Sequence, residues 1–407
     1  MSRTDARRGA SRTRRMTPRR TGLAALTAGL ALAAAGCASS SGGSSGAASG
    51  AASPAADTAT TVSISLTPQG CAPRPAKITA GQVQFNVANK DAGSVSEAEL
   101  RTSDLAKILG EQENLTPGLS GGFALTLQPG TYKINCPGAS QPHWTLTVSG
   151  KSSGQAWQSS PQLTAAVSGY SGYVSQNAAS LVTSTQQMCA AINAKSLSQA
   201  ELLYPRAREY YERIEPVAEI WGNLDTDIDG RWENPVTVAA QFTGFHRIEQ
   251  LLWEDDTLTG TPALCAGLVK NEQQLLTLVR SGSYNPLEMA SGATGLINEA
   301  ATAKISGEEE RYSNTDLPVF KANVDGATEV VSLLKPYLQK KDPGLLAMID
   351  SRDAAVDAQL VHYQASPGYD DTGYVEYSTV LTSQRRQLSG VVNAFAEALS
   401  KVSLQVS

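Results

Sequence analysis

The chain has 407 residues, which is long enough for two or three domains, and its 33 basic and 38 acidic side chains give a net charge of −5. Residues 1–36 hold eight of the arginines and a single acid, so the rest of the chain has a net charge of about −12. Such an acidic surface excludes nucleic acid as an expected partner and favours cations.

The N-terminal segment predicts export from the cytoplasm. Residues 1–36 combine a basic region with the uncharged run TGLAALTAGLALAAAG, and Cys37 follows directly. A basic region, an apolar run and small residues before a cleavage point form a signal peptide. The run is too short and too rich in alanine and glycine for a spanning helix, which needs about 20 apolar residues. We therefore expect no transmembrane segment in the mature protein.

Two export routes fit this segment. Cleavage before Cys37 would give a lipoprotein, anchored by lipid to the outer face of the cytoplasmic membrane, although Ala34 stands where a leucine is more usual. Arg19 and Arg20 also fit a twin-arginine signal, which would give a soluble periplasmic form. Residues 37–60 are rich in serine, glycine and alanine, so we expect a flexible tether there.

Residues 61–150 are predicted to form a small β-sandwich. Apolar and polar side chains alternate at 62–66, 83–87, 123–127 and 144–148, so each of these strands should bury one face. Pro129 and Gly130 are placed for a type II turn between two strands. A sandwich of roughly 90 residues is the fold that such short, alternating strands favour.

Residues 161–405 are predicted to be helical, after a polar linker at 151–160. Strand alternation stops here, and long runs are separated by SGSYNP, KDPG and SPGYDDTG. We expect about eight helices in a bundle, and hence a multidomain β + α protein. Six of the expected helices are Gln162–Ala194, Ser198–Trp221, Val236–Trp253, Pro262–Arg280, Thr315–Gln339 and Gly373–Val402.

Four cysteines remain once Cys37 is set aside. Cys71 and Cys136 lie in the β segment, and Cys189 and Cys265 lie in the helical one. One disulfide in each domain is the simplest pairing in an oxidising compartment, and a bridge closing the long loop between Cys189 and Cys265 would stabilise the fold by up to ~4 kcal/mol. The alternative is that Cys71 and Cys136 are thiolate metal ligands.

One stretch of the helical segment, GFHRIEQLLWEDD, carries His246 and Glu249. Three residues apart on a helix, they share one face, and an imidazole with a carboxylate is half a site for iron, zinc or copper. Acidic residues gather upstream, at Glu212, Glu215 and Glu219 and at Asp225, Asp227 and Asp229. Two such helices facing each other across a bundle would complete a metal site of four to six ligands.

Other interpretations of these residues stay open. A single H-x-x-E has little specificity, and an acidic stripe is often solvated. The apolar neighbours Phe245, Ile248 and Leu251 favour burial, and buried charges need partners or a metal. DTDIDG resembles the start of an EF-hand loop, but Val236 stands in place of its final glutamate. The sequence has no H-E-x-x-H or P-loop motif.

Several long stretches carry a family resemblance, among them YYERIEPVAEIWGNLDTDIDGRWE, FTGFHRIEQLLWEDD and SGEEERYSNTDLPVFKANVDGA. They resemble the EfeO branch of the imelysin family, also called the M75 peptidase family. ENLTPGLSGGFALTLQPGTYKINCPG is similar to the cupredoxin-like domain of that branch. The resemblance implies a cupredoxin-like Greek-key β-sandwich followed by an all-α imelysin helical bundle. It also implies an extracytoplasmic iron-binding component of an Efe-type uptake system, working beside an iron permease and a haem peroxidase.

The resemblance also suggests site residues in the helical domain. It places the H-x-x-E motif of the family on His246 and Glu249, which become the best metal ligands. Glu215 in ERIEP and Asp229 in IDGR are implied as completing ligands, and Glu309 in SGEEERY as a further acidic candidate.

A second metal site in the β domain is implied in the same way. Glu97 and Glu99 in SVSEAELR are its acidic candidates, and Cys71 and Cys136 match the cysteines of the family. The His-Cys-His-Met set of a blue-copper protein is missing from the sequence, which argues against copper electron transfer.

A metal-binding uptake protein is the function that we favour from the sequence. Acid-rich oxygen ligands with one imidazole suit ferrous or ferric iron, and copper or zinc are the other candidate cofactors. The family label supplies the alternative, a metal-dependent peptidase in which Glu249 acts as a base towards a metal-activated water. One histidine leaves too few nitrogen ligands for the usual zinc hydrolase, so we expect no enzymatic activity.

Overall fold

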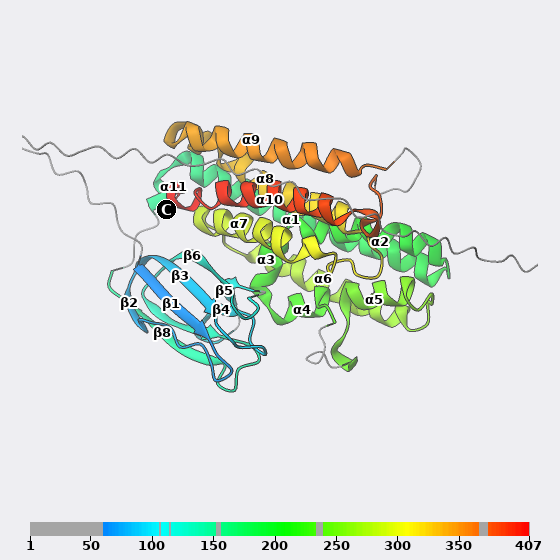
Figure 1. Cartoon of the computed structure of the whole chain (residues 1–407), viewed down its shortest axis with the longest axis horizontal. Coiled ribbons are helices and arrows are strands. Elements are labelled where there is room, and N and C mark those ends of the chain that lie inside the picture. Colours follow the sequence, from blue (N-terminus) through cyan, green and yellow to red (C-terminus); the bar gives the residue numbers. More distant parts are fainter. Residues whose placement is uncertain are drawn as a thin grey trace, which may run out of the picture. The chain divides into compact units, whose positions relative to one another are not determined.

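The computed structural model describes residues 60–105, 107–113, 115–151, 156–232, 239–365 and 373–406. The predicted export signal, Cys37 and nearly all of the tether lie outside these residues. Within the described residues, no helix combines the length and the apolar character needed to cross a membrane. Residues 55–407 form one unit by their contacts, with the strands in the N-terminal part and the helices after them (Figure 1).

The N-terminal part is a sandwich of two sheets. One sheet has the strand order β1-β3-β6, with β1 (Thr60–Leu66), β3 (Gly81–Asn89) and β6 (Ser120–Leu127). The other has the order β2-β8-β7-β4-β5, with β2 (Lys77–Thr79), β8 (His143–Ser149), β7 (Gly130–Asn135), β4 (Ala98–Thr102) and β5 (Ile108–Gln112). β1 pairs with β3, and β2 with β8, in parallel, whereas the remaining pairs are antiparallel.

The alternation of apolar and polar residues in the sequence matches the alternation of buried and exposed residues along these strands. Val62, Ile64 and Leu66 are buried on one face of β1, while the residues between them are exposed. Phe85 stacks on Phe123 across β3 and β6 with 4.7 Å between ring centroids. The predicted β-sandwich is therefore confirmed, and its two sheets enclose one hydrophobic core.

The rest of the chain is helical. The α-helices are α1 (Pro161–Asn193), α2 (Leu197–Glu212), α3 (Glu215–Ala218), α4 (Asn223–Asp229), α5 (Gly244–Trp253), α6 (Thr261–Ser281), α7 (Pro286–Thr302), α8 (Asp316–Lys341), α9 (Pro343–Leu360), α10 (Thr382–Leu399) and α11 (Ser403–Val406). Short 3-10 helices, η1 (Ala156–Ser159), η2 (Glu219–Trp221), η3 (Ala239–Gln241), η4 (Lys304–Ser306), η5 (Val361–Tyr363) and η6 (Tyr377–Thr379), lie between them.

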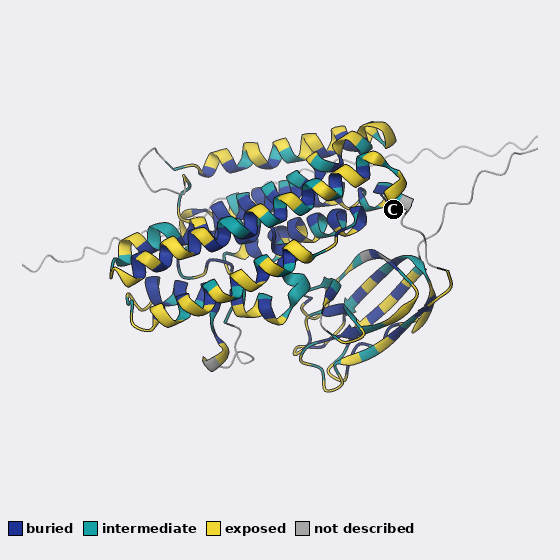
Figure 2. Cartoon of the chain, turned by 180° about the vertical axis from the view of Figure 1, so that it is seen from behind, coloured by how far each residue is buried: buried dark blue, intermediate teal, exposed yellow. Residues whose placement is uncertain are grey.

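The long helices pack side by side as a bundle. α1 contacts α2, α6 and α8, and α10 contacts α7 and α9. Each long helix buries one stripe and exposes the other, as Figure 2 shows by the alternation of dark blue and yellow along the ribbons. The predicted helical bundle is confirmed, and a disulfide between Cys189 and Cys265 joins α1 to α6.

Some predicted helix boundaries were wrong. The helix expected over Ser198–Trp221 is divided, because α2 ends at Glu212 and α3 begins at Glu215. Pro216 lacks the N–H that would continue the hydrogen-bond ladder of α2. Gly222, with a φ of 23°, then separates η2 from α4. The helix expected from Gly373 begins only at Thr382.

The helix expected over Val236–Trp253 begins only at Gly244, and part of its predicted start lies outside the described residues. Gly244 has a φ of 74°, a left-handed conformation that favours glycine. A Cβ at this position would collide with the backbone carbonyl of Ile228 in α4. The glycine therefore lets the start of α5 approach the end of α4, which brings His246 next to Asp229.

Candidate metal centre

A cluster of charged side chains lies inside the helical domain, where α2, α3, α4, α5 and the segment from η4 to α8 meet. We call it the buried centre. Its six carboxylates belong to Glu212, Glu215, Asp229, Glu249, Glu309 and Glu310, and its basic side chains to Arg208, Arg231, His246 and Lys304. All are buried except Asp229 and Arg231, which are partly exposed.

His246 has its two ring nitrogens in different surroundings. Nδ1 lies 3.1 Å from Oε2 of Glu249, one turn later in α5. Nε2 lies 3.3 Å from Oδ1 of Asp229 and 3.8 Å from Oε1 of Glu309, yet it makes no aligned hydrogen bond to any described residue. A buried nitrogen without a hydrogen bond is costly unless a ligand completes it. Nε2 is therefore the nitrogen available to a cation.

Glu249 is held at both carboxylate oxygens. Oε1 accepts hydrogen bonds from the backbone N–H groups of Tyr312, at 3.0 Å, and Ser313, at 2.8 Å. Oε2 faces the imidazole. A carboxylate placed on the second nitrogen of a metal-binding histidine sets its tautomer and orientation. This geometry favours Glu249 as the residue that orients His246.

Three sets of ligand atoms in this centre lie within 4.8 Å of one another, close enough to hold a metal ion. They are Asp229, His246 and Glu309; His246, Glu249 and Glu310; and Glu212, Glu215, Asp229 and Glu309. The structure thus brings His246, Glu249, Glu215, Asp229 and Glu309 into one place, whereas Glu219 and Asp225 line a different pocket and Asp227 is exposed. It adds Glu310, which the sequence analysis missed although it is adjacent to Glu309 in SGEEERY, and it draws Glu212 into the site.

Arg208 connects most of these carboxylates. Its guanidinium group, which has 0% of its surface exposed, donates to Oε1 of Glu310 at 2.7 Å and to Oε1 of Glu309 at 2.9 Å. It also pairs with Glu212 and Asp229. The sequence analysis missed this residue, because one arginine in a helix carries no pattern that marks it as buried.

Lys304 and Arg231 supply the remaining positive charge. The Lys304 ammonium donates to Oε2 of Glu212 at 2.8 Å and to both oxygens of Glu215 at 2.7 and 2.6 Å. Arg231 pairs with Glu309, and its second terminal nitrogen lies 3.7 Å from Oε1 of Glu299. These cations compensate charges that would otherwise be buried without partners.

The pKa values follow from these pairings. Burial lowers the pKa of His246, but the nearby carboxylates of Asp229 and Glu249 outweigh burial and raise it to about 10. Burial raises the pKa of Glu309, but Arg231, Lys304 and Arg208 bring it well below its usual range. His246 therefore carries a proton at neutral pH, and a metal ion binding at Nε2 would have to displace that proton.

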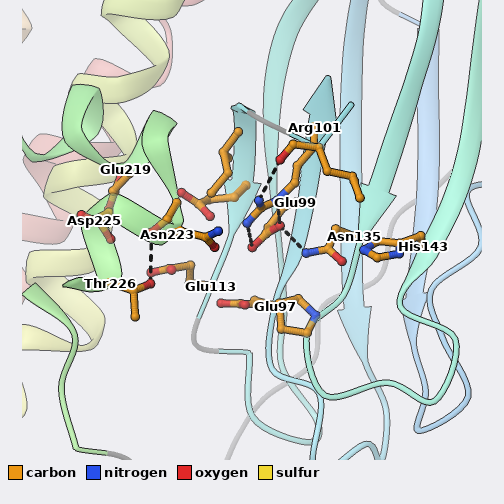
Figure 3. Close-up of a pocket in the computed structure, with 15 residues that line it drawn as sticks. Glu97, Glu99, Arg101, Glu113, Asn135, His143, Glu219, Asn223, Asp225 and Thr226 are labelled. Atoms are coloured by element: carbon orange, nitrogen blue, oxygen red, sulfur yellow. Dashed lines mark hydrogen bonds and ion pairs between the residues drawn. The ribbon is translucent and has the colours of Figure 1, made fainter. Parts of the chain in front are cut away.

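A second acidic cluster lines a pocket of about 490 Å³, which we call the acidic pocket. Its carboxylates come from Glu97, Glu99, Glu111, Glu113, Glu219 and Asp225, and Figure 3 shows strands on one side and helices on the other. Burial and the charges of neighbouring acids raise the pKa values of Glu111, Glu113 and Glu219 well above their usual range.

The residues predicted for a β-domain metal site lie in or near this pocket. Oε1 of Glu99 accepts from Nη2 of Arg101 at 2.9 Å, and its Oε2 accepts from Nδ2 of Asn135 at 2.6 Å. Glu97 lines the same pocket. Cys71 and Cys136 form a disulfide, so the alternative in which they are thiolate ligands was wrong.

The fold and the site define a class: a cupredoxin-like sandwich joined to a helical bundle whose core carries an H-x-x-E histidine among carboxylates. Family models agree, since the imelysin (peptidase M75) model matches residues 166–402 and the cupredoxin-like domain model matches residues 29–148. The chain belongs to the imelysin family.

Particular relatives are more informative about the whole chain. It is similar to proteins named iron uptake system component EfeO from Escherichia coli (strain K12), from Shigella flexneri and from Escherichia coli O1:K1. Each is 36% identical over 345 residues, which cover 84% of this chain and 90% of the relative. Both domains therefore have counterparts in these relatives.

Proposed function

We propose that this protein is the iron-binding component of an iron uptake system. It captures iron and delivers it to a membrane permease. The observation that carries the proposal is Nε2 of His246, which is buried, makes no hydrogen bond to a described residue, and lies beside the carboxylates of Asp229 and Glu309. The names of the similar proteins point to the same function.

The donor atoms support iron as the cargo. His246, Asp229 and Glu309 offer one nitrogen and carboxylate oxygens, a set that suits ferrous or ferric iron and is poorer for a soft metal. Glu249 orients the imidazole, and Glu215 lies next to the same group of carboxylates. Copper and zinc are the competing metals, because both accept imidazole.

The alternative function, a metal-dependent peptidase, has less support. A hydrolase needs a base that can take a proton from a metal-bound water. Both oxygens of Glu249 are engaged, one by two backbone N–H groups and the other by the imidazole. Each group of possible ligands in the buried centre contains at most one histidine. The peptidase label comes from the name of the family alone.

Location and partners form part of the same proposal. A signal at residues 1–36, lipid on Cys37 and a tether at 37–60 would keep residues 61–150 and 161–405 outside the cytoplasm, close to a membrane. The partners would be the iron permease and the haem peroxidase of the same system. Glu97 and Glu99 would add to an acidic entrance that attracts cations, since both line the acidic pocket.

Titration of the purified protein with iron tests the proposal. The wild type should bind iron, and His246→Ala should weaken binding about 100-fold or more because it removes a ligand, whereas Glu249→Gln should weaken it about 10- to 100-fold, as expected for an orienting partner. His362→Ala, which alters an exposed histidine in η5 outside both acidic clusters, is the matched control and should bind as the wild type does. Failure of the wild type to bind iron, or undiminished binding by His246→Ala, would refute the proposal.

A further inference from the structure

Lys304 is a fully buried lysine whose ammonium is enclosed by carboxylates. Nζ donates to Glu212 and Glu215 at 2.6 to 2.8 Å and lies 3.7 Å from Oε1 of Glu309. Asn323 completes this enclosure, because its Nδ2 donates to Oε2 of Glu212 at 2.9 Å and to Oε2 of Glu215 at 3.2 Å. Nζ makes three hydrogen bonds, and each acceptor is a carboxylate oxygen, which is the arrangement of an ammonium group. The side chain is therefore an ion-paired cation.

The oxygens around this ammonium belong to a group that could hold a metal ion. One oxygen each from Glu212, Glu215, Asp229 and Glu309 lies within 4.8 Å of the others. Lys304 contacts three of these carboxylates, and Arg208 pairs with Glu212, Asp229 and Glu309. Side-chain cations thus occupy the positions where a metal ion would find carboxylate oxygens.

A separate observation points to a ligand at the same place. Oε1 of Glu309 lies 3.7 Å from Nζ of Lys304 and 3.8 Å from Nε2 of His246. That nitrogen belongs to a side chain with 2% of its surface exposed, and it makes no hydrogen bond to a described residue. Oδ1 of Asn323, also fully buried, likewise has no such partner among the described residues.

We propose that the Lys304 ammonium occupies a cation-binding position in the buried centre and leaves it when the cargo metal ion binds. This inference rests on the proposed function. In the metal-free protein Lys304 neutralises Glu212, Glu215 and Glu309, and in the loaded protein the metal ion takes over that task. Because the lysine competes with the metal, it lowers the affinity of the site and allows the ion to be handed on.

Lys304 suits this task better than Arg208. The Arg208 guanidinium is planar, spreads over four carboxylates, and lies 5.2 Å from the ring centroid of Phe245 and 5.6 Å from that of Tyr211. Its removal would leave several charges unpaired at once. Lys304 ends in one nitrogen on a flexible stem and starts from a 3-10 helix of three residues. It can therefore withdraw while Arg208 stays in place.

Lys304→Met tests this inference, because methionine has nearly the same length and no charge. The variant should bind iron about tenfold more tightly than the wild type and release it more slowly, since a charge a few ångströms from the ion is removed. Its metal-free form should have a lower Tm, because three carboxylates lose their counter-ion, and iron should raise that Tm more than it raises the Tm of the wild type. A purely structural lysine would lower the Tm of both forms without tightening iron binding, which would overturn the inference.

Lys321→Met is the matched control. Lys321 pairs with Asp325 and Asp357 on the partly exposed surface of α8. Its loss should leave the affinity for iron and the iron-induced change in Tm unchanged. The same tightening in both variants would mean that net charge alone is responsible, and it would overturn a specific role of Lys304.

A crystal structure of the iron-loaded wild type gives a test that does not depend on whether Lys304→Met folds. Nζ of Lys304 should then lie beyond hydrogen-bond distance of Glu212 and Glu215, to which it donates in the metal-free protein, and the metal ion should be bound to oxygens of Glu215 and Glu309. An ammonium still seated among Glu212, Glu215 and Glu309 next to a bound ion would overturn the inference and leave the proposed function intact. A wild type that binds no iron in titration would overturn both.

Discussion

The buried centre and the acidic pocket each contain six carboxylates, but they differ in the positive charge beside them. In the buried centre, Arg208, Arg231 and Lys304 contact the acids directly. The basic side chains that line the acidic pocket are Arg101, which pairs with Glu99, and the exposed His143.

The difference shows that neighbouring charged side chains decide whether the pKa of a buried carboxyl group is raised or lowered. Burial raises the pKa in both places, but in the centre Arg208 lowers the pKa of Asp229, and Arg231 and Lys304 lower that of Glu309. In the pocket the charges of neighbouring acids add to burial, so the pKa values of Glu111 and Glu113 are raised, although Arg231 opposes the shift of Glu113. Asp229 and Glu309 therefore offer ionised oxygens to a metal at neutral pH, whereas burial and Glu212 raise the pKa of Glu215, and burial raises that of Glu310 although it pairs with Arg208.

Among the predictions that follow, replacement of Arg208 should have the largest effect on stability, because it removes the main cation of the buried centre. Arg208→Met leaves four carboxylates without their common partner, and the free energy of unfolding should fall by about 3–5 kcal/mol, as for a broken buried ion pair. Urea denaturation of the metal-free protein measures it. Arg213→Met, on the same stretch of chain but in partly exposed pairs with Glu209 and Asp325, should cost less than about 1 kcal/mol. Equal losses would contradict a central role for Arg208.

The two disulfides allow the helical bundle and the β-sandwich to be destabilised separately. Cys189→Ser with Cys265→Ser opens a crosslink across 76 residues, and the free energy of unfolding should fall by about 2–4 kcal/mol. Because α1 and α6 belong to the bundle, iron binding at the buried centre should weaken in the same variant. Cys71→Ser with Cys136→Ser should lower the stability of the sandwich and leave iron affinity unchanged. Equal losses of iron affinity in both pairs would show that the centre depends on the sandwich.

Glu272 in α6 is a third case, a buried acid whose hydrogen-bond partner among the described residues is Thr185 and not a basic side chain. Oε1 accepts a hydrogen bond from Thr185 at 2.7 Å, Oε2 has no partner among the described residues, and burial raises the pKa of Glu272 well above its usual range. The folded state therefore holds the proton more firmly than the unfolded state, so stability should fall as the pH rises above about 4.3, the ordinary pKa of glutamate. Glu272→Gln should be more stable than the wild type by at least about 1 kcal/mol at pH 8, and the difference should vanish near pH 4.

Thermal unfolding of both proteins between pH 4 and pH 8 checks this prediction. Glu397→Gln is a control for loss of a carboxylate, because Glu397 in α10 is exposed and pairs with Lys401, and its substitution should change the free energy of unfolding by less than about 1 kcal/mol. A stability difference for Glu272→Gln that does not change with pH would contradict the assigned cause.

Neutralisation of one acid in the acidic pocket should have the smallest effect. Glu113→Gln removes one of the mutually repelling carboxyls. The Tm should therefore rise slightly, and the free energy of unfolding should increase by less than about 1 kcal/mol. Iron affinity should stay within about twofold, because Glu113 belongs to none of the three groups of possible ligands in the buried centre. Iron titration at physiological ionic strength measures it, and a tenfold loss would show that the pocket belongs to the binding site.

Much of the site could be predicted from local pattern. His246 and Glu249 share a helix face because they are three residues apart, and Glu212 and Glu215 show the same spacing. The turn between α2 and α3 could not be predicted in the same way, since Pro216 is also compatible with the first turn of a helix. Glu310 and Lys304 were missed because their partners are remote, with a sequence separation of 102 between Glu310 and Arg208 and of 92 between Lys304 and Glu212.

The sequence by itself determined the two domains and the imidazole with its carboxylate, because the periods of strands and helices and the i, i+3 spacing are local properties of the chain. Only the tertiary structure decided which acids surround His246 and which cations neutralise them. Gly244 shows the physical reason: it allows α5 to approach Ile228 in α4, and a contact of that kind is fixed by packing between segments. The charge state of each buried acid then depends on the partner that packing brings to it.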